Sequence, residues 1–576
     1  MLDLLITDVR LVDGTGAPER RADVGVRDGR VVLGDALTGD ATATIDGTGL
    51  VLAPGFIDPH THYDAQFLWD PYGAPSNLHG VTTTINGNCG FTLAPLRDED
   101  GRWSLEMLAE VEGMPIEALM EGVPADWTSF GDYLDRLDGT LGVNAAFLVG
   151  HCALRRYVMG AAGTGNEASD EQIEAMKDEL RAALDAGGMG FSSSQSFTHD
   201  DGDGNPVPSR AATTDEVLAL ASVVSEFEGT TLEYITDGCL KGFTDEEIER
   251  LTRISLAGKR PLNWNVLTVD SREPDKVERQ LAASEYAEEH GARVVALTMP
   301  VLVPMNMSFR TRCALTLIPG WDEILTLPIP ERMERLRDPR VREKMLRDIH
   351  DEKAGVMQRF NRFRDYEIGD TFSEENKPLE GRTVGEIADE RGTEPFDALL
   401  DIVLVDELRT VLWPLPLEDD DESWRMRMRL IDEERVLIGG SDGGAHLDRM
   451  LGSTYPTELL GDTIRGRRLL SLERAVQLIT DTPARLFGLR DRGRIEHGAH
   501  ADLVLFDPDT IGAGPVRMVA DLPAGNERLH SRPEGIRGVW VNGVRTVIDN
   551  ESTGAVPGTV LRSGRDTETV RVPGSS

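Results

Sequence analysis

Residues 50–62 read LVLAPGFIDPHTH, an apolar run that leads into two histidines, His60 and His62. Such a run is typical of a buried strand, and it places both histidines at the carboxyl end of that strand. Because side chains at positions i and i+2 of an extended chain point to the same side, both imidazoles can reach one metal ion. Neutral imidazole is the commonest protein ligand for zinc and related ions. This stretch therefore predicts a buried strand that ends in part of a metal site.

The composition is that of an acidic globular protein. The chain has 576 residues, 40% of them hydrophobic and 28% charged, and this length favours one large domain with a smaller one. Acidic residues outnumber basic ones by 100 to 60, which gives a formal charge of −40. Phosphate binding requires a basic patch, so we expect neither nucleic acid nor an anionic membrane surface as a partner.

Targeting signals and disulfides are not expected. Residues 1–8 lack the basic segment of a signal peptide, and no segment approaches the roughly 20 apolar residues that span a membrane. Four cysteines in so long a chain do not form a disulfide framework. We therefore expect a cytoplasmic protein with reduced thiols, in which Cys152, Cys239 and Cys313 are core residues.

The middle of the chain alternates apolar strands with amphipathic helices, which predicts a parallel sheet with crossover helices. Several of these helices begin with a capping box, at Ser169, Thr213 and Thr244. The candidate strands are 50–57, 80–87, 143–150, 188–193, 230–236, 261–267, 292–298 and 435–441. Their number and spacing predict an α/β fold with a (β/α)8 TIM-like barrel.

The two ends of the chain are both rich in short strands and turns. Asn542-Gly543, between apolar runs, is a strong hairpin signal. We expect a small β-sandwich built from residues 1–53 and 481–576, beside a barrel formed by residues 54–480. The gap between the last two candidate strands, about 299–434, is too long for an ordinary connection and predicts an insertion in the barrel.

Polar residues with metal or proton chemistry follow four of the candidate strands. Besides the histidine pair, these residues are Cys89 in GVTTTINGNCG, His151 in LVGHCALR and Asp442 in VLIGGSDGG. Barrel enzymes place their chemistry at the carboxyl ends of the strands, so we expect these side chains to converge. His446 lies four residues beyond Asp442 and is a candidate for the lining of the same pocket, although a purely structural role is equally open.

Together these motifs resemble the amidohydrolase superfamily, and within it the N-acyl-D-amino-acid deacylases, or D-aminoacylases. The matching stretches are GFIDPHTHYD, GVTTTINGNCGFTLAP, LVGHCALRRYVMG, SDGGAH and TPARLFGLRDRGRIEHGAHADLVLFDP. The resemblance implies a barrel beside a small β-sandwich. It also implies a zinc site with His60, His62 and Cys89 as ligands. Asp442 would bind the metal or its water, take the proton of that water and deliver it to the departing nitrogen.

The sequence departs from this family on the fifth and sixth strands. The deacylases carry a histidine at the end of each, whereas this chain has Glu233 on the fifth and Asn263 or Asn265 on the sixth. No lysine on the fourth strand offers a carbamate bridge, and Phe197 stands near the position of a family tyrosine. We therefore expect one firmly held zinc ion. A second ion is left open, and so is manganese or another divalent metal in place of zinc. Glu233 is a candidate ligand, and His151, Asn265 and Phe197 are candidate substrate or outer-shell residues.

These features predict an enzyme that hydrolyses a linear amide, such as an N-acyl D-amino acid. Two alternatives stay open: a cyclic-amide hydrolase of the hydantoinase type, and an inactive barrel that serves as a binding protein. The strand-four lysine and later histidines that hydantoinases require are missing, which argues against the first. Retention of His60, His62 and Asp442 argues against the second. The expected partner is a small-molecule amide, and the sequence leaves a homo-oligomer open.

Overall fold

The chain divides into two compact units in the computed structural model, which describes residues 1–310, 314–416 and 418–575. The first unit consists of Met1–Val301, Glu422–Leu447 and Gly452–Ser576, and the second of Leu302–Asp421 and Asp448–Leu451. The second unit therefore occupies most of the stretch in which the sequence analysis places an insertion. Cys152 and Cys239 are buried, whereas Cys313 lies outside the described residues.

Parallel strands form the centre of the first unit, and each of the eight predicted segments contains a strand. One sheet holds β6 (Phe56–Asp58), β7 (Val81–Asn86), β8 (Asn144–Phe147) and β25 (Val560–Leu561). The other holds, in spatial order, β9 (Val149–Gly150), β10 (Gly190–Gln195), β11 (Thr231–Thr236), β12 (Leu262–Trp264), β13 (Val294–Thr298) and β16 (Val436–Ile438). All neighbours in both sheets are parallel.

The two parallel sheets are connected at two places. Only Leu148 separates β8 from β9 along the chain. Beyond β6 and β16, a parallel bridge joins Thr61 to Gly443, and the Asp442 N–H donates to the His60 carbonyl over 3.2 Å. The carboxyl ends of the first and last strands therefore lie side by side, which brings His60 and Asp442 together.

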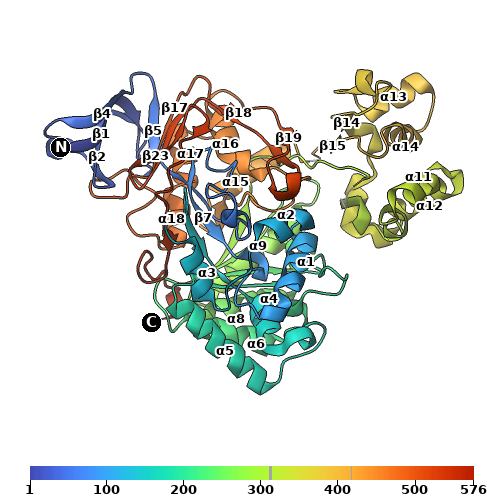
Figure 1. Ribbon diagram of the computed structural model, residues 1–576, viewed down its shortest axis with the longest axis horizontal. Helices are drawn as coiled ribbons and strands as arrows, with labels where there is room; N and C mark the ends of the chain where they lie inside the picture. The colour runs from blue at the N-terminus through green and yellow to red at the C-terminus, as the bar shows by residue number, and fades with distance from the viewer. Residues whose placement is uncertain (311–313, 417, 576) are drawn as a thin grey trace. The chain divides into compact units, whose positions relative to one another are not determined.

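Amphipathic helices pack against the parallel strands. They include α4 (His151–Met159), α5 (Asp170–Asp185), α6 (Thr214–Val224), α8 (Asp245–Gly258), α9 (Pro274–Glu289) and α18 (Asp481–Leu486). The first unit also contains α3 (Phe130–Leu137), α16 (Tyr455–Ile464), α17 (Leu472–Leu478) and nearly all of α15 (Asp421–Ile431). Three further helices, α1 (Gly101–Val111), α2 (Ile116–Gly122) and α7 (Gly238–Lys241), lie in loops that follow the carboxyl ends of β7 and β11. Figure 1 shows α5, α6 and α8 beside one another in green.

The predicted capping boxes are present at Ser169 and Thr244 but only half formed at Thr213. There the Thr213 hydroxyl accepts a hydrogen bond from the Glu216 N–H, but the Glu216 carboxylate does not accept the reciprocal bond from the Thr213 N–H. That carboxylate instead accepts hydrogen bonds from His151 (3.0 Å) and Arg155 (2.6 Å), and all three side chains are buried. A buried guanidinium requires a counter-charge, so Glu216 turns inward rather than toward the helix end.

A nine-stranded sheet combines both ends of the chain. Its N-terminal strands are β1 (Leu2–Leu11), β2 (Arg20–Arg27), β3 (Arg30–Val32), β4 (Ala41–Asp46) and β5 (Val51–Pro54). Its C-terminal strands are β17 (Leu503–Phe506), β22 (Ile536–Val541), β23 (Val544–Ile548) and β24 (Glu551–Ser552). β5 pairs in parallel with β1 and antiparallel with β17, so blue and red strands adjoin in Figure 1. The predicted hairpin is present, with Asn542 (φ 49°) and Gly543 (φ 82°) joining β22 to β23.

Two small antiparallel pairs complete the first unit: β18 (Gly512–Ala513) with β21 (Pro533–Glu534), and β19 (Arg517–Val519) with β20 (Arg528–His530). The second unit has a core of its own. Its elements are α10 (Asp322–Leu325), α11 (Ile329–Arg337), α12 (Pro339–His350), α13 (Val384–Arg391), α14 (Pro395–Val405) and the antiparallel strands β14 (Tyr366–Ile368) and β15 (Leu412–Pro414). Trp321, Phe363 and Phe396 stack together in that core.

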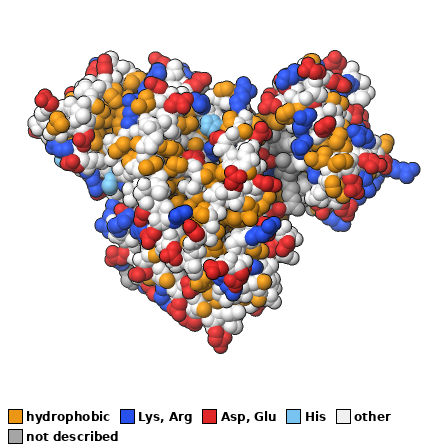
Figure 2. All heavy atoms as spheres, viewed as in Figure 1, with side chains coloured by type: hydrophobic (Ala, Val, Ile, Leu, Met, Phe, Trp, Pro, Cys, Tyr) orange, Lys and Arg blue, Asp and Glu red, His pale blue; other side chains and the backbone are white. Residues whose placement is uncertain are grey.

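The surface carries both signs of charge. Figure 2 shows Asp and Glu side chains spread over the visible face with Lys and Arg side chains between them. Among the described residues, we find no helix that combines the length and the apolar character needed to cross a membrane.

Candidate metal centre

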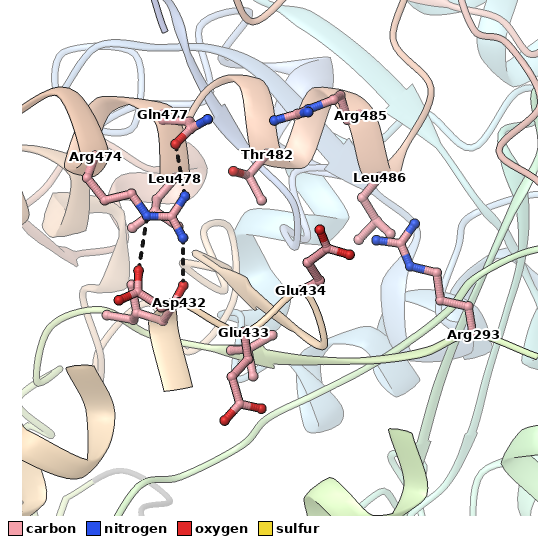
Figure 3. A pocket seen from close by; sticks show the side chains of 12 residues that line it. Arg293, Asp432, Glu433, Glu434, Arg474, Gln477, Leu478, Thr482, Arg485 and Leu486 are labelled. Carbon is pink, nitrogen blue, oxygen red and sulfur yellow. Dashed lines mark hydrogen bonds and ion pairs between the residues drawn. The ribbon is translucent and has the colours of Figure 1, made fainter. Parts of the chain in front are cut away.

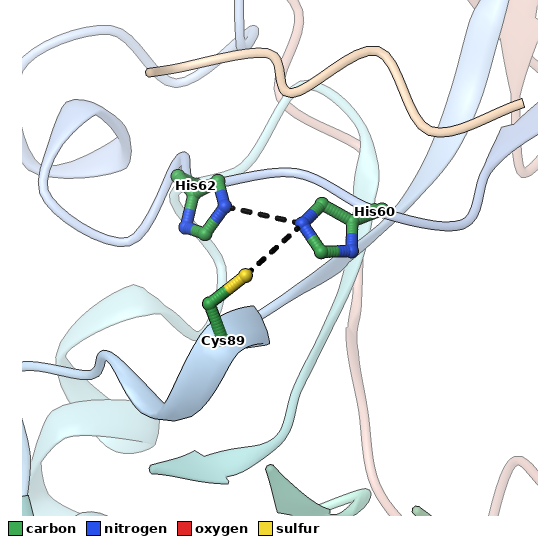
Figure 4. Close-up of side chains that lie close together, drawn as sticks. All are labelled: His60, His62 and Cys89. Atoms are coloured by element: carbon green, nitrogen blue, oxygen red, sulfur yellow. Dashed lines mark hydrogen bonds between the residues drawn. The ribbon is translucent and has the colours of Figure 1, made fainter. Parts of the chain in front are cut away.

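His60 and His62 leave the carboxyl end of β6 on the same side of the chain, as the alternation predicts. Their Nε2 atoms are 3.3 Å apart, and the two side chains are only 4% and 2% exposed (Figure 4). Burial and the neighbouring His62 lower the pKa of His60 to about 3, so this imidazole is neutral and its lone pair is available to a cation.

Cys89 approaches the pair from the turn after β7. This residue has a positive φ of 55°, and its Sγ lies 3.6 Å from His60 Nε2 (Figure 4). Asn265, which follows β12, donates from Nδ2 to the sulfur over 3.3 Å. Burial, together with the charge of Glu233, raises the pKa of the Cys89 thiol well above its usual range. A thiolate at this position is therefore favoured only beside a strong positive charge.

Asp442 completes the group from the loop after β16. Its Oδ1 lies 3.1 Å from His62 Nε2 and 3.6 Å from His60 Nε2, while its Oδ2 lies 3.6 Å from His446 Nε2. Burial works against the charge of this carboxylate, but the hydrogen bond and charge of His62 outweigh it and hold the pKa of Asp442 below its usual range. The structure thus brings His60, His62, Cys89, Asp442 and His446 together.

Glu233 and Asn265 lie on the Cys89 side of the group. Glu233 Oε2 accepts the Cys89 N–H over 2.7 Å, and this buried side chain is 3% exposed. Burial raises the pKa of Glu233 to about 8, against the opposing effect of that hydrogen bond. Glu233 Oε1 and Asn265 Oδ1 have no hydrogen-bond partner among the described residues.

The donor set fits a divalent metal ion. Two groups have ligand atoms that all lie within 4.8 Å of one another: His60, His62 and Cys89, and His62, Glu112 and Asp442. Two imidazoles, a thiol and a carboxylate are the ligand types that zinc prefers. Buried oxygens without partners, such as Glu233 Oε1, point the same way, because such atoms are costly unless they bind something.

Three residues near the group were not predicted from the sequence to lie there. Glu112, directly after α1, places Oε1 3.3 Å from His62 Nδ1. Asp64 Oδ2 accepts the Gly87 N–H over 3.2 Å, next to the turn of Cys89. His199 Nδ1 lies 2.7 Å from Ser194 Oγ, and its ring packs edge-on against Phe91. Asp64 could have been found from its two-residue spacing from His62, and His199 from its position after β10. No pattern in the sequence marks Glu112.

Two of the sequence candidates lie in other surroundings. His151 is fully buried between Ser193 Oγ at 2.8 Å and Glu216 at 3.0 Å, in the network with Arg155. The Phe197 ring lies 3.8 Å from the Lys241 ammonium group, and its N–H donates to Asp237. These contacts place neither side chain in the group around His62.

A cavity of about 460 Å³ lies at the other ends of the strands. Its lining includes Arg293 and Glu434, which precede β13 and β16. Arg474 also lines it and donates hydrogen bonds to Asp432 and Gln477 (Figure 3). The candidate metal ligands follow the carboxyl ends of strands, so this cavity is separate from them. Catalysis in parallel barrels takes place at the carboxyl ends, and we assign the cavity no part in it.

Comparison with known proteins decides the family. The model of the Amidohydrolase family matches residues 43–547, which is most of the chain. The chain belongs to the amidohydrolase family. Among amidohydrolases it is 30% identical to D-aminoacylase of Alcaligenes xylosoxydans xylosoxydans over 97% of both chains. It is also 30% identical to N-acyl-D-aspartate deacylase of the same organism, over 98% of this chain and 95% of the relative.

Solved amidohydrolase structures agree with this assignment. A crystal structure of D-aminoacylase superposes with a TM-score of 0.63 at 27% identity, covering 98% of this chain and all of the other. N-acyl-D-glutamate deacylase from Bordetella bronchiseptica, complexed with zinc and a phosphonate mimic of the tetrahedral intermediate, gives 0.62 at 27% identity over the same shares. Related structures thus contain zinc, and a further D-aminoacylase structure concerns a binuclear metal centre.

Proposed function

We propose that this amidohydrolase is a metal-dependent enzyme that hydrolyses the linear C–N bond of an N-acyl amino acid, with N-acyl-D-amino acids as the favoured class. Relatives that match nearly the whole chain are deacylases of such compounds. The observation that carries the proposal is the convergence of His60, His62, Cys89 and Asp442 after three different strands, with Asp442 Oδ1 3.1 Å from His62 Nε2.

We assign one firmly held zinc ion to His60, His62, Cys89 and Asp442, with manganese or another divalent ion as alternatives. Glu233 is a further candidate ligand because its Oε1 has no hydrogen-bond partner within the described part of the chain. When bound, the metal supplies a Lewis acid that polarises the scissile carbonyl and makes a water more acidic at neutral pH.

The residues of the chain supply proton transfer and orientation. Asp442 stays ionised at neutral pH, so a carboxylate oxygen of Asp442 accepts the proton of the attacking water and then delivers it to the departing nitrogen. His62 orients that carboxylate through Oδ1, and His446 contacts Oδ2. Neutral His60 presents a lone pair instead of a competing proton. Burial of both histidines keeps bulk water from screening these interactions.

We also propose the finer architecture that this chemistry requires. The eight predicted strands close into a (β/α)8 barrel within residues 54–480, and the Thr61–Gly443 bridge supports closure between the first and last strands. Residues 1–53 and 481–576 form the β-sandwich domain, supported by the shared sheet of β5 and β17. The stretch at about 299–434 is an insertion with its own core. The proposed assembly to be tested for this chain is a homo-oligomer.

Substitution of Asp442 tests the proposed function. In Asp442→Asn the carboxamide cannot accept the proton, so kcat should fall about 10²–10⁴-fold or more while the thermal unfolding midpoint stays near wild type. Activity is measured on paired N-acyl-D- and N-acyl-L-amino acids and on a hydantoin, with zinc or manganese supplied. Asp432→Asn, an exposed carboxylate of the same unit, is the matched control. Near-wild-type turnover of Asp442→Asn, or wild-type protein inactive on the whole panel with metal bound, contradicts the proposal.

A further inference from the structure

The turn that carries Cys89, formed by residues 87–90, bends through the left-handed region of backbone space. Gly87, Cys89 and Gly90 have φ values of 72°, 55° and 79°. Glycine enters this region freely, but Cys89 does so only at a cost, so contacts from outside the turn must hold it there. Figure 4 shows that the Cys89 side chain points from this turn toward the two histidines. The contacts that hold the turn therefore also direct the sulfur.

One hydroxyl group contacts both ends of this turn. Ser192, on β10, donates from Oγ to the Gly87 carbonyl over 2.5 Å and accepts the Gly90 N–H over 3.1 Å. Its side chain is fully buried, so water does not compete for either hydrogen bond. The turn also lies directly on β10, because an added Cβ at Gly90 would meet Ser193 Cα at 3.1 Å. The fourth predicted strand, which supplies none of the assigned ligands, thus supplies a support for one of them.

A second buried side chain holds the middle of the turn from the neighbouring strand. Ser192 is paired in register with Glu233 of β11, so both side chains point to the same face of the sheet. Glu233 Oε2 accepts the Cys89 N–H over 2.7 Å. Ser193 points to the opposite face, where its hydroxyl lies 2.8 Å from His151 Nδ1. Of the two adjacent serines, Ser192 is therefore the one whose hydroxyl contacts the turn.

We propose that Ser192 is the positioning residue of Cys89: its hydroxyl joins the two ends of the turn and so keeps the sulfur within reach of an ion bound by the two histidines. Asp64 and Glu233 each accept one N–H of the turn, whereas Ser192 fixes both of its ends. Hydrogen bonds of this kind orient metal ligands, and their loss commonly weakens metal binding. The inference rests on the proposed metal centre, and it concerns the geometry of one ligand rather than the choice of substrate.

Cobalt(II) in place of zinc tests the proposal, because a sulfur–cobalt bond gives a near-ultraviolet charge-transfer band that imidazole and carboxylate ligands do not give. Ser192→Ala should weaken this band per bound ion. It should also raise the zinc dissociation constant about 10-fold or more, measured in competition with a chelating dye. Ser193→Ala is the matched control, since it removes an equally buried hydroxyl from the opposite face of the same strand. It should lower the thermal midpoint by a similar amount, yet keep the wild-type band and affinity.

A wild-type band in Ser192→Ala overturns the proposal, and so does an equal loss of the band in Ser193→Ala or its absence from the wild type. If Ser192→Ala does not fold, amide hydrogen exchange of the metal-free wild-type protein, labelled with ¹⁵N-glycine, is the second measurement. The Gly90 amide should exchange at least about 10-fold more slowly than the amide of Gly139 in an exposed turn, and equal rates overturn the proposal. None of these readouts needs turnover, so a wild type that binds metal yet hydrolyses nothing on the substrate panel contradicts the proposed function alone.

Discussion

Three residues of the candidate site share an unusual backbone conformation. Cys89, Asp442 and His446 have φ values of 55°, 57° and 50°, in the left-handed region that side chains other than glycine seldom adopt. Each such residue costs about 1 kcal/mol or more, and residues of this kind cluster at functional sites. Here the conformation turns each loop immediately after its strand, and it aims the thiol and the carboxylate at the same histidine pair.

A residue away from the metal group should control stability in mild acid. His79 is fully buried, with Thr457 Oγ1 at 2.6 Å and the Ser531 carbonyl at 3.1 Å. Burial lowers the pKa of His79 from 6.5 to about 4, against the opposing effect of the Ser531 carbonyl. The unfolded chain therefore takes up this proton first as the pH falls. The stability that His79 contributes is complete above pH 6.5 and is lost progressively toward pH 4.

Between pH 7.5 and 5.0 this loss should amount to about 2 kcal/mol of the free energy of unfolding. His79→Gln should be less stable than the wild type at pH 7.5 and should show a shallower decline between the two pH values, as measured by urea denaturation. His290→Gln, which changes an exposed histidine of the same unit, serves as control. Equal slopes for wild type and His79→Gln would show that another group is responsible.

At the residue scale, motifs predicted which candidate ligands lie together but not the acidic residue beside them. His60, Cys89 and Asp442 lie in short stretches directly after apolar strands, and that placement alone brings strand-end side chains together. Glu112 follows strand β7 by more than twenty residues, at the end of an ordinary amphipathic helix among other acidic residues. Its approach to His62 depends on how α1 packs, which no local pattern in the sequence specifies.

At the scale of elements, the position of Cys89 depends on close backbone packing. Gly150, where β9 meets α4, leaves so little room that an added Cβ would lie 2.6 Å from the Gly90 carbonyl oxygen. Gly90 directly follows Cys89, so a methyl group here must displace the turn that carries the thiol. Backbone atoms cannot move aside as a flexible side chain can, and overpacking of this kind costs about 1–3 kcal/mol.

Gly150→Ala should therefore lower the thermal midpoint and also raise the zinc dissociation constant, measured in competition with a chelating dye. Gly101→Ala is the matched control, because its Cβ would meet only Ala125 Cβ at an ordinary 3.7 Å. If Gly150→Ala keeps wild-type affinity for zinc, the turn of Cys89 does not depend on this contact.

Elements were predictable where one local cause determines them. Each of the eight predicted apolar runs contains a parallel strand, and Asn542-Gly543 forms the hairpin that its sequence indicates. Thr213 shows where local reasoning fails: the capping box needs the Glu216 carboxylate, which pairs instead with buried Arg155. A tertiary ion pair outweighs the helix end in that case, because leaving the guanidinium without a counter-charge costs more than one capping bond.

At the scale of the whole molecule, a buried ion pair connects the terminal sheet to the parallel strands. Asp502 precedes β17 and accepts hydrogen bonds from Arg492, from the Asn542 N–H at 2.7 Å and from Asn144 Nδ2 of β8 at 3.3 Å. Asp502 and Arg492 are 6% and 8% exposed. Removal of one partner leaves the other charge buried and unpaired, which costs about 3–5 kcal/mol.

Asp502→Ala should accordingly reduce the free energy of unfolding by about 3–5 kcal/mol in urea or thermal denaturation. The double variant Arg492→Ala, Asp502→Ala should lose less than the two single variants together. Glu19→Ala is the control, because it removes an exposed pair with Arg10 in the same sheet and should cost less than about 1 kcal/mol. A similar small loss for Asp502→Ala would mean that the buried pair does not hold the sheet in place.

The order of strands along the chain predicted the arrangement of the sheets, but it did not predict the boundaries of the two compact units. Alternating strands and helices predicted the parallel sheet, and strand-rich ends predicted that both termini share one β region. The second unit, Leu302–Asp421 with Asp448–Leu451, also takes in a short segment beyond Asp442, which composition gives no reason to expect. Side-chain packing over long sequence distances decides such boundaries.

The sheet shared by both ends of the chain has a consequence for synthesis. β5 follows β1 closely along the chain, but its other neighbour, β17, is translated only after strands β6 to β16 and the entire second unit. Until Leu503 leaves the ribosome, one edge of β5 is left without its hydrogen-bonding partner, and such edges recruit strands from other chains. A pause or premature stop before residue 503 should thus yield a nascent protein with an unpaired strand edge a few residues before its first two candidate metal ligands.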